Sequence, residues 1–112
     1  MSYSMEISGS TATITPSTDR FDAYLAPEFR STVTDALDKE VTSITVDMRN
    51  VMFVDSSGLG SIVSCHKLLQ SANGIELVNV NHEVREIFRL THMDKVFDLN
   101  KNSPDHTNNK AA

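Results

Sequence analysis

The pattern of hydrophobic and polar positions in the first third of the chain predicts a hairpin followed by a helix. Residues 5–7 and 12–14 alternate apolar and polar side chains with a period of two, and Gly9 and Ser10 between them suit a tight turn. Apolar side chains then recur at four-residue spacing, which predicts a first helix over about residues 26–39. These positions are Phe29, Val33 and Leu37, and Pro27 lies near the expected helix start.

The rest of the folded part alternates strands with helices. A β-rich run at residues 43–48 and a short apolar run at 51–54 precede an amphipathic helix that starts at 56–58. Another strand is predicted at 75–80, and Asn81 is placed to cap a third helix. Apolar residues of the third helix and of a last short element packing back onto the core are Val84, Ile87, Phe88 and Leu90, then Met93, Val96, Phe97 and Leu99. This order predicts an α/β fold in which helices pack against a mixed, mostly parallel sheet that opens with a β-hairpin.

The length of the chain limits it to one domain. Its 112 residues weigh 12.4 kDa. We expect a folded domain over residues 1–100 and a disordered tail over residues 101–112, which are polar and lack apolar periodicity. The N-terminus has no pattern of a secretory signal, and no apolar run approaches the roughly 20 residues that cross a bilayer. Since the single Cys65 cannot form an internal disulfide, we expect a cytoplasmic protein without membrane insertion.

Charge narrows the choice of partners. Ten Lys and Arg residues against fifteen Asp and Glu residues give a formal net charge of -5, and the basic residues are scattered. A nucleic-acid-binding protein usually concentrates cations in a stripe that neutralises phosphates, so we expect no nucleic-acid partner. A basic protein surface is the more natural partner. The sequence contains no long exposed apolar run of the kind that would suggest self-association, so a monomer is the simplest expectation.

The segment with the clearest chemical pattern is residues 53–60. A strand-like run ends at Asp55, two serines follow, and Gly58 and Gly60 open a helix whose first N–H groups attract anions. One interpretation is a capped strand-to-helix turn. Another is that one serine caps the helix while the other presents its hydroxyl to solvent. The residues alone do not decide which of Ser56 and Ser57 would present its hydroxyl to solvent.

The residue spacing in this segment excludes several known catalytic and nucleotide-binding motifs. A nucleophile elbow needs glycine where Val54 or Asp55 stands, a phosphate-binding P-loop needs a Gly-Lys-Ser/Thr ending, and a dinucleotide fingerprint needs a glycine at Val63. The adjacent pair Cys65-His66 has no second pair spaced to complete a metal site. We therefore expect no metal, no cofactor and no enzymatic activity.

A phospho-aspartate receiver domain is a further alternative, with Asp47 as the acceptor. That class also needs an acidic cluster after the first strand to hold a divalent cation, and residues 5–8 supply none. Asp47 is better explained as a structural acid that bonds to the backbone or pairs with Arg49.

The hexapeptide Asp-Ser-Ser-Gly-Leu-Gly at residues 55–60 resembles the signature of the STAS family, which comprises anti-sigma factor antagonists and cytoplasmic domains of sulfate transporters. Residues 21–30 resemble the start of the family's first helix, residues 46–48 its central strand, and residues 77–85 its fourth strand and third helix. The resemblance extends over roughly residues 5–99 and implies the STAS fold. One departure is Asp19, where the family often has glycine, so contacts of that loop could differ here.

The resemblance also implies a function of the stand-alone antagonist type. The first serine of the motif, Ser56, is then the phosphoacceptor. The partners are a Ser kinase of the histidine-kinase-like ATPase class, bound by the unphosphorylated form, and a metal-dependent Ser phosphatase. The output could be transcription, stress response or biofilm control. An alternative is a constitutive scaffold subunit of a transport complex, which needs no hydroxyl at Ser56.

The partner-binding residues expected from the resemblance and from helical spacing lie on two segments, and Asp22 is the acid that matches the family's loop aspartate. Two of them, Leu59 and Ile62, have core packing as their alternative role, as does His66, a further docking candidate. The expected set is Asp22, Asp55, Ser57, Gly58, Leu59, Gly60 and Ile62.

Overall fold

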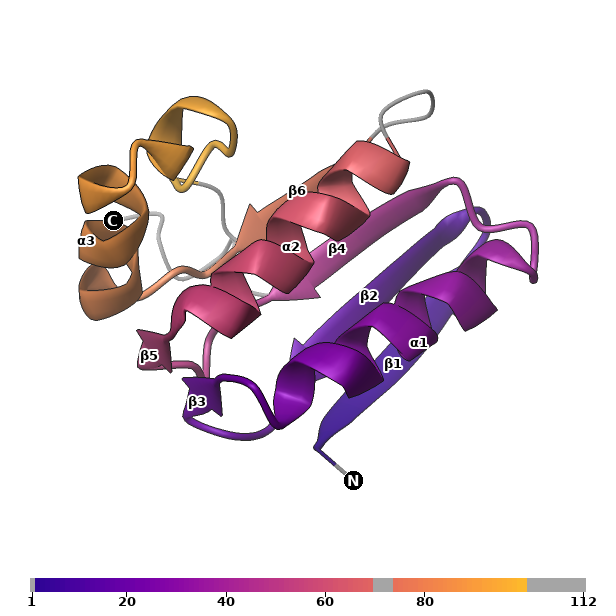
Figure 1. The fold of residues 1–112 in the computed structure, drawn as a ribbon. Helices are drawn as coiled ribbons and strands as arrows, with labels where there is room; N and C mark the ends of the chain where they lie inside the picture. The colour runs from indigo at the N-terminus through magenta and orange to yellow at the C-terminus, as the bar shows by residue number, and fades with distance from the viewer. Residues whose placement is uncertain (1, 70–73, 101–112) are drawn as a thin grey trace, which may run out of the picture.

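A four-stranded mixed sheet with two helices across one face forms the frame of the protein (Figure 1). The computed structural model describes residues 2–69 and 74–100. In chain order the elements are β1 (Tyr3–Ser8), β2 (Thr11–Pro16), β3 (Arg20–Phe21), α1 (Leu25–Leu37), β4 (Ser43–Asp47), β5 (Phe53–Val54), α2 (Ser56–Leu68), β6 (Ile75–Val78), α3 (His82–Leu90) and the 3-10 turn η1 (Met93–Lys95).

The sheet has the order β1-β2-β4-β6. The first pair is antiparallel and the other two are parallel, so the predicted hairpin and the mixed, mostly parallel sheet are confirmed. Period-two alternation explains the core. Ala12 and Ile14 of β2 are fully buried toward the helices, while the threonines between them are only half-buried on the other face. Ile44 and Val46 continue this buried row on β4.

Helix α1 follows the predicted spacing. Phe29 and Val33 are fully buried and Leu37 packs against the core from its margin. The helix starts at Leu25, one residue before the predicted boundary, and ends at Leu37, two residues before it. Figure 1 shows α1 and α2 side by side over the same face of the sheet. The two helices therefore bring their N-terminal ends to the same edge of the molecule.

A second, two-stranded sheet connects these N-terminal ends. Strand β3 pairs in parallel with β5, with Arg20 opposite Phe53. The sequence did not predict β3, because two residues leave no periodicity to detect. The carbonyl oxygen of Asp19 accepts hydrogen bonds from the N–H groups of Met52 (2.7 Å) and Phe53 (3.1 Å). Asp19 is not among the non-glycine residues with positive φ in the described part of the chain, so an aspartate fits there without strain.

The C-terminal elements differ from the prediction in two details. Asn81 does precede α3, but its side chain makes no capping hydrogen bond to the helix. Its amide nitrogen instead donates to the carbonyl oxygen of Val51 at 2.8 Å, which ties the start of α3 to the segment before β5. Phe97 and Leu99 are buried as expected, whereas Val96 is 46% exposed and Leu90 is 70% exposed. The tail expected at residues 101–112 lies outside the described residues.

Candidate functional site

Ser56 is the first residue of α2 and follows β5 through Asp55. Both Ser56 and Ser57 are exposed. The helix is capped by neither of them: the Asp55 carboxylate accepts the N–H of Gly58 at 2.8 Å. Of the two interpretations, the structure supports the capped strand-to-helix turn, with Asp55 rather than a serine as the cap. Within the described residues, neither serine hydroxyl makes a hydrogen bond to another group of the chain, so both can meet a partner.

The backbone that carries Ser56 is held against β3. The N–H of Asp55 donates to the carbonyl oxygen of Phe21 at 3.2 Å. A Cβ atom added to Gly58 would lie only 2.0 Å from that same oxygen. Gly58 is buried, and the close approach of the two backbones requires a glycine there. Gly60, in contrast, is exposed and has no atom within 4 Å of an added Cβ.

Asp22 shapes the start of α1 at the same edge of the molecule. Its carboxylate accepts the N–H of Tyr24 at 3.0 Å and lies 3.6 Å from the Nε atom of Arg20. Asp22 directly follows Phe21, whose carbonyl oxygen accepts the N–H of Asp55, so the Asp22 backbone lies close to the N-terminus of α2. Figure 1 shows β3 beside β5 at this end of α2. The structure thus brings together Asp22 and the 55–60 segment, which the sequence placed in separate motifs.

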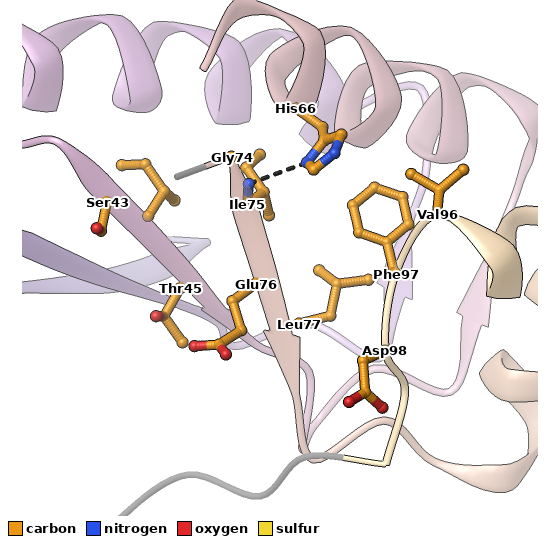
Figure 2. A pocket seen from close by; sticks show the side chains of 11 residues that line it. Ser43, Thr45, His66, Gly74, Ile75, Glu76, Leu77, Val96, Phe97 and Asp98 are labelled. Carbon is orange, nitrogen blue, oxygen red and sulfur yellow. Dashed lines mark hydrogen bonds between the residues drawn. The ribbon is translucent and has the colours of Figure 1, made fainter. Parts of the chain in front are cut away.

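Two expected docking residues on α2 are structural instead. Ile62 is 0% exposed and belongs to the core, so the packing alternative holds for it. The Nδ1 atom of His66 accepts the N–H of Ile75 at 3.0 Å, and its ring meets Phe97 edge-on at 4.8 Å (Figure 2). Leu59 is half-buried and packs against the core while part of it stays accessible.

His66 also borders a hollow of about 330 Å³ between β6 and the segment after η1 (Figure 2). The hollow lies near the C-terminal end of α2, ten residues and about 15 Å along the helix from Ser56. The described residues include no group of three or more potential metal ligands. Burial raises the pKa of the neighbouring Cys65 thiol, with a smaller opposing effect from Arg30, so the thiolate that a metal prefers is disfavoured.

Asp47 has the structural role predicted for it. The residue is 2% exposed, and its carboxylate oxygens accept hydrogen bonds from the backbone N–H of Arg49 (3.1 Å), the Nε atom of Arg49 (3.0 Å) and the amide of Asn79 (3.0 Å). Burial raises the pKa of this carboxyl, but the hydrogen bonds and the Arg49 charge outweigh it, and the net pKa lies below the ordinary value. A carboxylate so engaged is not an accessible phosphoacceptor.

Sequence reasoning did not identify three residues that the structure places on the surface near Ser56: Arg20, Met52 and Phe53. The 51–54 run looked uniformly apolar, and only its outer members Val51 and Val54 are buried. The guanidinium of Arg20 lies over the ring of Phe53, 4.5 Å from its centroid. Their positions depend on the β3–β5 pairing, which no local pattern signalled.

Comparisons with known proteins agree with this geometry. A family model described as STAS domain matches residues 3–106. The chain is 27% identical over 81 residues to the anti-sigma-B factor antagonist of Staphylococcus aureus, covering 71% of this chain and 75% of the relative. None of the described helices is long and apolar enough to pass through a membrane.

Solved structures share the fold. An anti-sigma factor antagonist from Mycobacterium paratuberculosis superimposes with a TM-score of 0.78 at 20% identity, over 95% of this chain and 90% of that one. The Bacillus cell fate determinant SpoIIAA in its phosphorylated form superimposes with a TM-score of 0.71 at 18% identity, over 98% and 99% of the two chains. The unphosphorylated form of the antagonist SpoIIAA matches with a TM-score of 0.77 at 20% identity, over 97% and 95%.

Proposed function

The chain belongs to the STAS domain family, and from this premise we propose that it is a partner-switching regulator controlled by phosphorylation of Ser56. The unphosphorylated form binds an ATP-dependent Ser kinase of the histidine-kinase-like ATPase class and releases the target that this kinase otherwise sequesters. Phosphorylated Ser56 ends that binding, and a metal-dependent Ser phosphatase restores it. The regulated output is transcription, stress response or biofilm control in the cytoplasm.

The observation that carries this proposal is an exposed hydroxyl on a fixed backbone. Asp55 supplies the helix cap and Gly58 the close packing, so the Ser56 side chain has no structural task among the described residues. Ser57 is equally exposed. The choice of Ser56 rests on the family motif, in which the first serine accepts the phosphate. The relative SpoIIAA, solved in both unphosphorylated and phosphorylated forms, supports a reversible modification in this fold.

The transfer itself would use groups of the kinase. The Oγ atom of Ser56 attacks the γ-phosphorus of ATP, the bond to the bridging oxygen breaks, and ADP leaves. A base in the kinase takes the proton of the Ser56 hydroxyl, and Mg²⁺ in the kinase balances the charge that develops on the phosphate oxygens. The carboxylate of the adjacent residue, Asp55, is occupied as the helix cap. The chain therefore acts as substrate and ligand.

A phosphate at Ser56 changes binding through charge rather than through unfolding. It adds about -1.5 to -2 charges at pH 7. The N–H groups of the first turn of α2 stabilise it locally, while the adjacent Asp55 carboxylate already carries a negative charge there. A desolvated contact between like charges costs several kcal/mol, which corresponds to roughly a thousandfold in affinity.

Intact mass measurement of the protein purified from its own cells tests the proposal. A species heavier by about 80 Da, the mass of an added HPO₃ group, should map to Ser56. The shift should disappear in Ser56→Ala and persist in the matched variant Ser57→Ala. A single unmodified mass, unchanged across growth conditions and after phosphatase inhibition, would contradict the switch and favour the constitutive scaffold.

A further inference from the structure

Exposed apolar side chains gather at the end of the molecule that carries Ser56. Of the seven large apolar side chains exposed in residues 2–69 and 74–100, three lie in the β3–β5 pair or within three residues of it: Tyr24, Met52 and Phe53. The other four are distributed over β1, the ends of α2 and α3, and the segment after η1. We call the three residues the β3–β5 patch. Phe53 precedes Ser56 by three residues, so the patch adjoins the proposed phosphorylation site.

The backbone under the patch is held by hydrogen bonds, and its three side chains are exposed. The Asp19 carbonyl oxygen holds the N–H groups of Met52 and Phe53, and the Arg20 guanidinium covers one face of the Phe53 ring. Tyr24 is 90% exposed although its N–H is bonded to a carboxylate. A tyrosine displayed in this way loses little conformational entropy on binding, because its side chain has only two rotatable angles.

Charge next to the patch indicates what kind of surface it fits. A hollow of about 270 Å³ lies beside Tyr24 and is lined by Asp19, Arg20 and Asp22 among others. Arg20 already pairs with Asp22 across 3.6 Å. The Asp19 carboxylate gives the hollow a net negative charge, which complements a Lys or Arg side chain.

We propose that Tyr24 and Asp19 select the kinase that phosphorylates Ser56. The matching kinase surface is an apolar groove that takes the Tyr24 ring, bordered by a Lys or Arg that enters the hollow beside Asp19. This inference rests on the proposed function, because it assigns the docking contacts of the same phosphorylation. Buried aromatic residues at the centre of an interface supply most of its binding energy, and neighbouring charges supply specificity and association rate.

The test measures initial rates of Ser56 phosphorylation in a clarified extract of the organism's own cells, with γ-labelled ATP, Mg²⁺ and phosphatase inhibitors. The full-length chain is added at subsaturating concentration. Tyr24→Ser is compared with Leu90→Ser, which removes a side chain that is 70% exposed at the distant end of α3. Asp19→Lys is compared with Asp35→Lys on the exposed face of α1. Circular dichroism and the Tm verify that each variant is folded.

Tyr24→Ser should lower the rate roughly thirtyfold, the equivalent of about 2 kcal/mol for a hot-spot residue, while Leu90→Ser keeps the wild-type rate. Tyr24→Phe should keep most of the rate, because the ring is what binds. Asp19→Lys should lower the rate at low salt, and the loss should shrink at about 0.5 M salt as screening increases. Wild-type rates in Tyr24→Ser, with Ser56 labelled, would overturn this inference and leave the proposed function intact. Absence of label on Ser56 in the wild-type chain would overturn both.

Discussion

Replacing Gly58 by alanine tests how the structure holds the Ser56 turn in place. The new Cβ would lie 2.0 Å from the Phe21 carbonyl oxygen, 2.8 Å from its carbonyl carbon and 2.9 Å from Cδ1 of its ring. Since two of these atoms are backbone, β3 and the start of α2 must separate by about 1 Å to reach an acceptable contact.

The expected loss of stability combines three effects. Overpacking costs about 1–3 kcal/mol, and the backbone neighbour places this site at the upper end. Separation also weakens the hydrogen bond from Asp55 to Phe21, worth about 0.5–1.5 kcal/mol. Alanine regains about 1 kcal/mol of helix propensity over glycine. The net expectation for Gly58→Ala is a decrease of about 2–3 kcal/mol in the free energy of unfolding.

Urea unfolding followed by circular dichroism measures this difference, and Gly60→Ala is the matched control. An added Cβ at Gly60 meets no atom within 4 Å, so this variant should equal or exceed the wild-type stability by up to about 1 kcal/mol. The Tm of Gly58→Ala should fall by roughly 10–20 °C. A Gly58→Ala protein as stable as Gly60→Ala would refute the contact between α2 and β3.

Three further outcomes follow from the site. Asp55→Ala should lower the free energy of unfolding by about 1 kcal/mol in urea titrations, while Ser56→Ala changes it by less than about 0.5 kcal/mol, because Asp55 and not Ser56 is the cap. The folded-state pKa of Asp47 is lowered, so its carboxylate stabilises the fold above the unfolded pKa of about 3.9, and this stabilisation is lost as the pH falls through the folded pKa. Unfolding titrations should therefore give a smaller loss of stability between pH 7 and pH 3 in Asp47→Asn than in the wild type. Ser56→Asp should keep the wild-type Tm but weaken binding to the partner kinase in calorimetry, whereas Ser56→Ala should bind as the unphosphorylated form does.

The elements with a repeated pattern were predictable from the sequence. The hairpin, α1 and the parallel strands each bury one regular set of side chains, and that set is visible as a period of two or about four. The resemblance of residues 55–60 to the STAS signature then identified the family, and the family model confirms it. Helix α2 started where the pattern placed it, at Ser56.

What the sequence did not reveal depends on contacts between distant segments. Strand β3 is two residues long and exists because β5 pairs with it. The side chain of Asn81 does not cap α3; its amide donates to groups of the 49–52 segment, the carbonyl oxygen of Val51 among them, which lie far from it in the sequence. The sequence left the cap of α2 open, because aspartate and serine have similar N-cap preferences and Asp55 directly precedes both serines.

The distance between Ser56 and the β3–β5 patch limits how the switch can act. Ser56 is the third residue after Phe53, which places the two residues within about 10 Å along the chain. That distance is close to the Debye length at physiological ionic strength, so in the free protein a phosphate at Ser56 has little effect on the patch. The same phosphate charge destabilises a complex in which the partner removes water from both Ser56 and the patch, because the effective dielectric constant falls there. Phosphorylation should therefore leave the free protein's structure and Tm nearly unchanged while increasing kinase dissociation. Tm measurements on the phosphorylated and unphosphorylated protein, paired with dissociation rates, check this; a large drop in Tm on phosphorylation would indicate unfolding as the mechanism instead.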